Sequence, residues 1–212
     1  MTPERLEKFR LAATRRQSNL TVILENVHDP HNLGAVLRSC DSVGIKEIFV
    51  IYTDPQLMDR DHIKLNKRTS SGARRWVDVH LYMDVEACFA HVRRHYEEIY
   101  ATHLDETAVS LYELDLTKSV ALLFGNEKDG LSQTCLAHAD GNFIIPQMGM
   151  VQSLNISVAC AVSIYEALRQ RQNAGMYTDN LPTTSAEQAA LYESFKERQL
   201  TRDKRHISER ID

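Results

Sequence analysis

Short apolar runs alternate with amphipathic stretches between Thr21 and Pro146, a pattern typical of βαβ units. The runs are rich in Val, Ile and Leu and continuously apolar, as expected for strands covered on both faces. The pattern therefore predicts an α/β fold with a mostly parallel sheet flanked by helices. We expect strands at 21–26, 47–52, 77–82, 98–103, 120–125 and 142–146, and helices near 33–43, 84–96 and 132–138.

A long helix is expected after the last of these strands, starting near Ser153. In NISVACAVSIYEALRQRQN the apolar residues recur at helical spacing, and either Ser153 or Asn155 can cap the first turn. Small side chains in its first half indicate close packing against another helix, in this chain or in a second subunit. The expected apolar stripe consists of Val158, Val162, Tyr165 and Leu168.

The two ends of the chain differ in composition from its central part. Residues 1–19 are predicted to form a basic helical extension, and residues 20–175 a single domain. Residues 176–212 form a C-terminal helical extension, which begins with NLPTTSAEQ, a stretch typical of a linker. Residues 185–205 then indicate a polar helix with little to bury besides Leu191 and Phe195, so we expect it at the periphery.

The composition is that of a protein able to bury a full core. The chain has 212 residues, of which 43% are hydrophobic, and no apolar run approaches the roughly 18 residues of a membrane span. Its start, MTPERLEKFR, lacks the apolar stretch of a signal peptide, so we expect a cytoplasmic protein without a membrane partner. Four widely spaced cysteines without a CxxC pair favour reduced, mostly buried thiols: Cys40, Cys88, Cys135 and Cys160.

Positive charge is concentrated in two segments, although the net charge is −4. Residues 1–19 carry five basic and two acidic side chains, and residues 60–76 carry six basic and one acidic. Attraction to phosphate is local and decays within roughly 10 Å at moderate salt, so two basic patches on an acidic body can bind RNA. Such segments are also common as solvated charged surface.

Three loop segments follow predicted strands at their carboxyl ends, where open α/β sheets bind ligands. The first, NVHDPHNLGAVLRSCDSVG at 26–44, has a turn at Asp29 and Pro30, a candidate helix cap at Asn32, and Arg38 inside the following helix. An arginine there is also compatible with an ordinary surface position. Contact between Asn32 and Arg38 would need Asn32 outside the helix, because residues six apart on a helix point in different directions.

The other two segments lie later in the chain. In LLFGNEKDGLS at 122–132, Gly125 and Gly130 mark a turn that lets the backbone approach a ligand, although plain turn glycines are an alternative. In IIPQMGMVQSLNISVACA at 144–161, the apolar loop at 148–151 would suit a purine-bearing cofactor. The polar residues just beyond it, Ser153 and Asn155, could equally be helix caps.

Several common ligand motifs are missing from the sequence. His28 and His31 have HxxH spacing but no third ligand, so we predict no metal and assign them loop or capping roles. There is no GK[ST] of a nucleotide P-loop and no GxGxxG after the first strand. These absences disfavour a nucleotide hydrolase and a dehydrogenase.

Taken together, the three segments resemble in order and spacing the signature motifs of the SpoU-type RNA 2′-O-methyltransferases. The resemblance covers roughly residues 20–175. The flanking stretches LAATRRQSNLTV and YEALRQRQNAGMY are further similar to the TrmH branch of that family, the tRNA guanosine-18 methyltransferases.

This resemblance implies a C-terminal deep trefoil knot, a rare exception to unknotted folding. It also implies S-adenosylmethionine as methyl donor, held largely by backbone groups of three loops, and an obligatory homodimer in which catalytic groups of one subunit meet the cofactor of the other. The implied reaction is 2′-O-methylation of guanosine 18 in the D-loop of tRNA, without a metal. The matching cofactor-binding positions are Thr102, Gly125, Ile145 and Leu154.

The same resemblance assigns Arg38 to the 2′-hydroxyl and Asn32 to holding the first loop, with Glu127, Ser153 and Asn155 as the polar framework. An arginine is a poor base because its pKa lies above roughly 12, so a substrate phosphate beside it is our candidate for assisting or accepting the proton. The C-terminal helix is shorter and more neutral than expected for this branch. Candidate tRNA phosphate contacts are Arg10, Arg15, Arg16, Arg74 and Arg75.

Alternative functions remain open from the sequence. The motifs build the cofactor site and not the substrate groove, so ribosomal RNA or the tRNA wobble nucleotide is an alternative substrate. An RNA-binding dimer that has lost catalysis is a second alternative, which the presence of all five catalytic-position residues disfavours.

Overall fold

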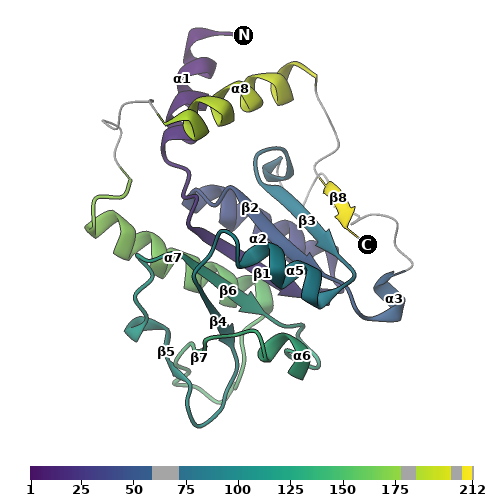
Figure 1. Ribbon diagram of the computed structural model, residues 1–212. Coiled ribbons are helices and arrows are strands. Elements are labelled where there is room, and N and C mark those ends of the chain that lie inside the picture. Colours follow the sequence, from purple (N-terminus) through teal and green to yellow (C-terminus); the bar gives the residue numbers. More distant parts are fainter. Residues whose placement is uncertain (59–71, 178–184, 202–206, 212) are drawn as a thin grey trace.

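The computed structural model describes residues 1–58, 72–177, 185–201 and 207–211. Within these residues, eight strands form one sheet in the order β5-β7-β4-β6-β1-β2-β3-β8, and every adjacent pair is parallel (Figure 1). The strands are β1 (Leu20–Glu25), β2 (Glu47–Ile51), β3 (Asp78–Tyr82), β4 (Glu98–Thr102), β5 (Val109–Ser110), β6 (Val120–Phe124), β7 (Gly141–Ile144) and β8 (Ile207–Ile211).

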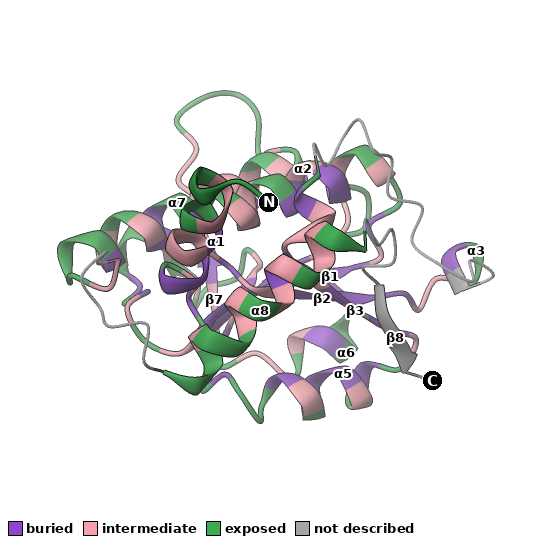
Figure 2. Cartoon of the chain, turned by 90° about the horizontal axis from the view of Figure 1, so that it is seen from above, coloured by how far each residue is buried: buried purple, intermediate pink, exposed green. Residues whose placement is uncertain are grey.

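Helices cover both faces of this sheet, which is seen between them in Figure 2. α2 (Pro30–Val43) and α7 (Ile156–Asn173) lie on one face, and α5 (Val85–Val92) and α6 (Gln133–Leu136) lie on the other. Each face has its own cluster of buried apolar side chains. The predicted α/β class with a parallel, doubly covered sheet is confirmed. The remaining elements are α1 (Pro3–Thr14), α3 (Pro55–Met58), α8 (Ala186–Leu200), η1 (Ala73–Arg75) and η2 (Leu111–Glu113).

All six predicted strands are present, with ends that differ by one or two residues. β1 and β6 are buried at every position, which explains why their sequences are continuously apolar. β5 and β8 were not predicted, because β5 has only two residues and β8 carries charged residues in a segment that we assigned to a helical extension. The helices expected at 84–96 and 132–138 exist but are shorter.

The start of α2 corrects our prediction for Asn32. The helix begins at Pro30, and Asp29 is its cap, because the Asp29 side chain accepts a hydrogen bond from the His31 amide at 2.7 Å. Proline fits the first helical position since it has no amide hydrogen to satisfy there. Asn32 therefore lies inside the helix, and its side chain is available for contacts other than capping.

The buried face of α7 also differs from the predicted apolar stripe. Asn155 caps the helix as expected, and Val162 and Leu168 are partly buried against the core. Val158 and Tyr165, however, are 46% and 50% exposed. The face that packs toward α2 and the sheet carries smaller and polar side chains instead. The buried residues of α7 are Ile156, Cys160, Ser163, Ile164, Glu166, Ala167 and Arg171.

The two ends of the chain pack against each other, as α1 and α8 lie side by side in Figure 1. Phe9 of α1 and Phe195 of α8 are buried, and Trp76 lies between them with ring centroids 5.4 and 5.5 Å away. The C-terminal helix is peripheral, as predicted, and Phe195 is its buried anchor.

All four cysteines are buried and free, as the sequence indicated. Burial, together with the nearby Glu25, raises the pKa of the Cys135 thiol to about 12. Burial also raises the pKa of Cys40 and Cys88. These three side chains are therefore neutral core residues and not thiolate nucleophiles. Among the helices that the structure describes, none has the length and apolar character needed to cross a bilayer.

Candidate functional site

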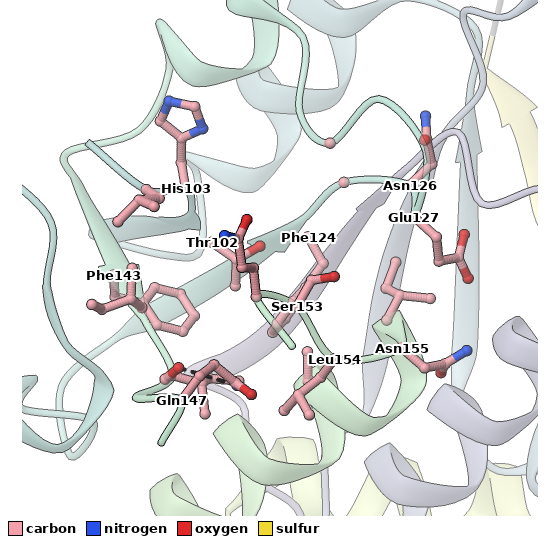
Figure 3. Close-up of a pocket in the computed structure, with 18 residues that line it drawn as sticks. Thr102, His103, Phe124, Asn126, Glu127, Phe143, Gln147, Ser153, Leu154 and Asn155 are labelled. Carbon is pink, nitrogen blue, oxygen red and sulfur yellow. Dashed lines mark hydrogen bonds between the residues drawn. The ribbon is translucent and has the colours of Figure 1, made fainter. Parts of the chain in front are cut away.

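A cavity of about 580 Å³ opens at the carboxyl ends of β4, β6 and β7 (Figure 3). Thr102, Phe124 and Ile144 end these three strands and line it, so the sheet itself positions one wall. Loop residues before α7 complete the lining. A volume of this size matches the sites that bind small organic molecules, which span roughly 300–1,000 Å³.

All four predicted cofactor residues line this cavity: Thr102, Gly125, Ile145 and Leu154. The Thr102 hydroxyl donates to the Leu123 carbonyl at 3.2 Å and so ties the end of β4 to β6. Ile145 and Leu154 contribute apolar wall. The prediction that these positions converge is therefore confirmed by geometry, whereas their contact with a cofactor stays a proposal.

The loop after β6 is folded tightly on itself. The Asn126 amide donates to the Gly130 carbonyl at 3.2 Å, and the Gly130 amide donates to the Asn126 carbonyl at 3.1 Å. The Asn126 side chain accepts hydrogen bonds from the amides of Lys128 and Asp129 at 2.8 and 2.7 Å. A Cβ atom at Gly125 would lie 2.2 Å from the Gly130 backbone, so this closed turn requires glycine at position 125.

A second anchor holds the far end of the same loop. Glu25, at the end of β1, is 1% exposed, and its carboxylate accepts a hydrogen bond from the Ser132 amide at 2.9 Å. Sequence reasoning missed Glu25, because it continues an apolar strand without belonging to a motif. It positions the loop that carries Glu127.

Three polar side chains from separate segments form a network beside the cavity. The Asn155 amide group donates to the Asn32 side-chain oxygen at 3.1 Å, and the Asn32 amide group donates to the Glu127 carboxylate. Asn155 is itself fixed as the cap of α7, because its oxygen accepts from the Ser157 amide at 2.9 Å. The network joins α2, the loop after β6 and the start of α7, as expected for a polar framework.

Ser153 also belongs to this region, since it lines the cavity close to Leu154 and Asn155 (Figure 3). Four of the five predicted catalytic residues are thus brought together within one chain. Arg38 is the exception. It is exposed on a different face of α2 from Asn32, as their spacing requires, and it lines another cavity.

This second cavity has a volume of about 410 Å³ and lies between α1, α2, η1 and α8. Four basic side chains line it, with one carboxylate, Asp41. Sequence reasoning missed Arg5 and Lys8, although their spacing of three places them on one face of the predicted N-terminal helix. The basic residues are Arg5, Lys8, Arg16 and Arg38.

The candidate phosphate contacts differ in their surroundings. Arg16 has a side chain only 5% exposed, and its guanidinium donates to the Asp41 carboxylate and to the Ile45 and Trp76 carbonyls. These internal bonds give Arg16 a structural role that competes with phosphate binding. Arg15 is exposed, and Arg10 is 37% exposed and paired with Glu7.

Arg74 and Arg75 lie on η1 and are half-buried, with the Arg75 guanidinium 5.7 Å from the Trp76 ring. The basic segment 60–76 lies mostly outside the described residues. His28 is paired with Asp54 at 3.2 Å, and the His31 amide is capped by Asp29, so both histidines have the loop and capping surroundings that we expected.

Open α/β proteins typically bind small molecules or cofactors at the carboxyl edge of a parallel sheet. The position and size of this cavity place the chain in that class. The chain belongs to the SpoU rRNA methylase family, whose model matches residues 19–165. The match contains all three motif loops and thus the whole polar network.

Two relatives and one solved structure show where in the family the chain lies. It is 41% identical over 192 residues to the tRNA (guanosine(18)-2′-O)-methyltransferase of Escherichia coli (strain K12), covering 90% of this chain and 81% of that protein. It is 44% identical over 176 residues to the protein of the same name from Thermus thermophilus, covering 83% and 88%. The crystal structure of the A. aeolicus TrmH/SpoU tRNA modifying enzyme is similar with a TM-score of 0.79 at 33% identity, covering 92% and 96%.

Proposed function

We propose that this protein transfers a methyl group from S-adenosylmethionine to the 2′-hydroxyl of guanosine 18 in tRNA. The observation that supports this most strongly is that Glu127 and Asn155, from two motif loops, meet at one cavity and are joined by hydrogen bonds through Asn32 of the third. The relatives named above, which match over four fifths of the chain or more, favour tRNA over the alternative RNA substrates.

The cavity fits the proposed cofactor in size and chemistry. Phe124, Phe143, Ile145 and Leu154 provide apolar walls suited to a purine ring, and Gly125 allows the loop after β6 to close tightly on Gly130 at the edge of the cavity. S-adenosylmethionine would supply a methyl group on a sulfonium, whose carbon a hydroxyl oxygen would attack in line with the departing thioether sulfur. We also propose that the chain around this site follows the knotted path of its family.

The side chains of this protein supply orientation in the proposed reaction. In-line displacement depends on holding the two reacting groups in one geometry, which can lower a barrier by several kcal/mol. The chain of hydrogen bonds from Asn155 through Asn32 to Glu127 fixes the polar side of the cavity before substrate arrives. No residue here needs a metal ion for that role, and we propose a metal-free reaction.

Arg38 is proposed to act across a dimer. Within one chain it lines the basic cavity and not the cofactor cavity, so it would meet the methyl donor of a second subunit. Large apolar side chains near the cofactor cavity and along α7 are exposed, as expected for a covered interface. They include Met148, Met150, Val151, Val158 and Tyr165.

The basic cavity is our proposed RNA-facing surface. Arg5 and Lys8 join Arg38 there. Arg10 lies on the adjoining α1, Arg15 directly follows that helix, and Arg74 and Arg75 lie on η1. Charge-assisted contacts to phosphate would hold the strand so that one ribose reaches Arg38, which is able to stabilise the developing alkoxide. We expect substitutions here to weaken binding of all tRNAs similarly and to reduce its salt dependence.

Methylation mapping tests the proposed function. The protein is incubated with labelled S-adenosylmethionine and either unmodified tRNA or unmodified ribosomal RNA, and the ribose-methylated nucleotide is located. We expect label at guanosine 18 alone. Label confined to ribosomal RNA would overturn the tRNA assignment, and no label in any RNA would favour a binding protein without catalysis.

Arg38→Lys tests the role of the guanidinium. Lysine keeps the positive charge but lacks the planar fork that binds two oxygens at once. We expect kcat to fall by about 100-fold, with S-adenosylmethionine binding unchanged, because a lost oxyanion donor typically costs that much. Unchanged turnover would remove Arg38 from the reacting atoms.

A further inference from the structure

The lining of the cofactor cavity includes two ionisable side chains among the described residues, His103 and Glu127. Figure 3 shows them on opposite sides, with Thr102, Phe124 and Ser153 between them. The remaining lining residues are apolar or carry neutral amides and hydroxyls. Among the lining residues, Glu127 therefore supplies the negative charge of this cavity.

The position of the Glu127 carboxylate is fixed by the loop that carries it and by its hydrogen-bond donor. The adjacent turn is closed by the paired backbone bonds of Asn126 and Gly130. Asn32 donates to the carboxylate and is held in turn by Asn155. One carboxylate oxygen thus has a neutral donor, and the negative charge is not cancelled by these partners.

We infer that Glu127 makes the cavity select the positively charged methyl donor over the neutral product of methyl transfer. This inference rests on the proposed function. S-adenosylmethionine carries a sulfonium, whereas S-adenosylhomocysteine carries a neutral thioether; the two ligands share every other group. Glu127 is exposed, so water screens its charge. At an effective dielectric constant of about 40, a cationic group that comes within about 6 Å of the carboxylate is still attracted enough to change affinity about tenfold.

Methyl transfer removes this attraction. The ribose oxygen forms a bond to the methyl carbon as the carbon–sulfur bond breaks, its electron pair stays on sulfur, and the hydroxyl proton passes to an acceptor. The sulfonium charge is thereby lost. The same carboxylate that favours entry of the donor then no longer holds the product, which favours exchange for a new donor molecule.

Isothermal titration calorimetry with three ligands tests this inference. The ligands are S-adenosylmethionine, S-adenosylhomocysteine and sinefungin, in which an amine-bearing carbon replaces the methylsulfonium and keeps a positive charge. In Glu127→Gln, we expect both cationic ligands to bind about tenfold more weakly than to the unchanged protein. The affinity for S-adenosylhomocysteine should change by less than about twofold, on the same grounds.

Glu106→Gln is the matched control, because Glu106 is an exposed carboxylate on the neighbouring loop and does not line the cavity. It should leave all three affinities unchanged. Equal weakening of all three ligands by Glu127→Gln, or no change in any, would overturn charge selection while leaving the proposed function standing. Failure of the unchanged protein to bind any of the three would overturn the proposed function itself.

Discussion

Gly125 shows how one backbone position decides the shape of the cofactor cavity. The loop returns on itself so closely that a Cβ atom at this position would lie 2.2 Å from both the carbonyl carbon and oxygen of Gly130. Backbone atoms cannot move aside as a flexible side chain can. The glycine is therefore required by packing.

Gly125→Ala is expected to open this loop. The clash should lower the free energy of unfolding by about 1–3 kcal/mol and weaken S-adenosylmethionine binding at least about tenfold, since the Glu127 loop is displaced. Thermal unfolding and calorimetric titration measure the two effects. Gly149→Ala is the control, because a Cβ atom there meets nothing within 4 Å. Equal behaviour of the two variants would show that the close approach is unimportant.

Asn32 and Arg38 show what the sequence could and could not predict for single residues. Their spacing on one helix correctly separated them: Asn32 bonds to Glu127 beside the cofactor cavity, and Arg38 lines the basic cavity. The prediction that Asn32 caps α2 was wrong, because aspartate and asparagine both cap helices and Pro30 favours the earlier start at Asp29. The partners of Asn32 lie 95 and 123 residues away in sequence, so no local pattern could reveal them.

α7 is held at its far end by a buried arginine. Arg171 is fully buried, and its guanidinium donates to the carbonyls of Leu116 and Lys118 at 2.8 and 2.7 Å. It also donates to the side-chain oxygens of Gln17 and Asn19 at 3.0 and 2.6 Å. These bonds tie the helix whose start carries Asn155 to the segments before β1 and β6.

Arg171→Met should destabilise the fold strongly. Methionine fills similar volume but leaves several buried acceptors without a donor, so we expect a loss of about 3 kcal/mol in the free energy of unfolding. Arg169→Met, two residues earlier, is the control. Its side chain is 62% exposed and paired with Glu166 within the helix, which predicts less than about 1 kcal/mol. Chemical denaturation compares them, and similar losses would contradict the account of α7.

The contact of β2 with β3 and α5 contains a carboxylate with a strongly shifted pKa. Burial alone raises the pKa of Glu47, but the hydrogen bond with His80 at 2.9 Å and the charge of Lys46 outweigh it and lower this pKa to about 2. Tyr96 also donates to this carboxylate at 3.0 Å. The charged form of Glu47 is therefore the one that the folded state stabilises.

The free energy of unfolding should therefore decrease as the pH falls. Because the pKa is lower in the folded state than the unfolded value of about 4.3, the contribution of Glu47 is complete above about pH 5 and is lost as the pH falls toward 2. It amounts to about 3 kcal/mol. Chemical denaturation at pH 7 and at pH 3 measures this effect. Between these pH values, the free energy of unfolding should fall less for Glu47→Gln than for the unchanged protein. Parallel curves would contradict this assignment, and Glu86→Gln, a 76% exposed site, is the control.

The presence of the longer helices and strands could be predicted more reliably than their end residues or the side of a helix that is buried. Apolar runs identified six strands, most clearly β1 and β6, which are buried at every position. β3, β4 and β7 also contain half-buried positions. The predicted stripe on α7 was half right: Val162 and Leu168 pack against the core, but small and polar side chains, including Ser163 and Arg171, occupy most of the buried face. A hydrophobic pattern cannot reveal such a face, and it instead marked Val158 and Tyr165, which are half-exposed.

The whole molecule exposes apolar side chains around its cofactor cavity, which we attribute to a second subunit. Val158→Asp on α7 should turn a dimer into a monomer, because a carboxylate would have to lose its hydration in the interface. Size-exclusion chromatography with light scattering should give about twice 24.2 kDa for the unchanged protein and this mass for the variant. Leu200→Asp, at a 72% exposed position on α8, should remain dimeric. A monomeric unchanged protein would exclude the proposed placement of Arg38.

The overall architecture followed from the sequence, whereas the joining of its two ends did not. Periodicity predicted the α/β class, and the motif loops predicted which segments would converge. The packing of Phe9 against Phe195 links residues at opposite ends of the chain. Single aromatic residues in two polar helices carry no pattern that identifies them as partners.

The central claim is that the cavity serves methyl transfer to one ribose hydroxyl, and a tRNA with a single altered sugar tests it most directly. Two tRNAs are compared that are identical except for guanosine or 2′-deoxyguanosine at position 18, and incorporation of labelled methyl from S-adenosylmethionine is measured. The account predicts stoichiometric labelling of the first tRNA and none of the second. Equal labelling of both, or none of either, would contradict it.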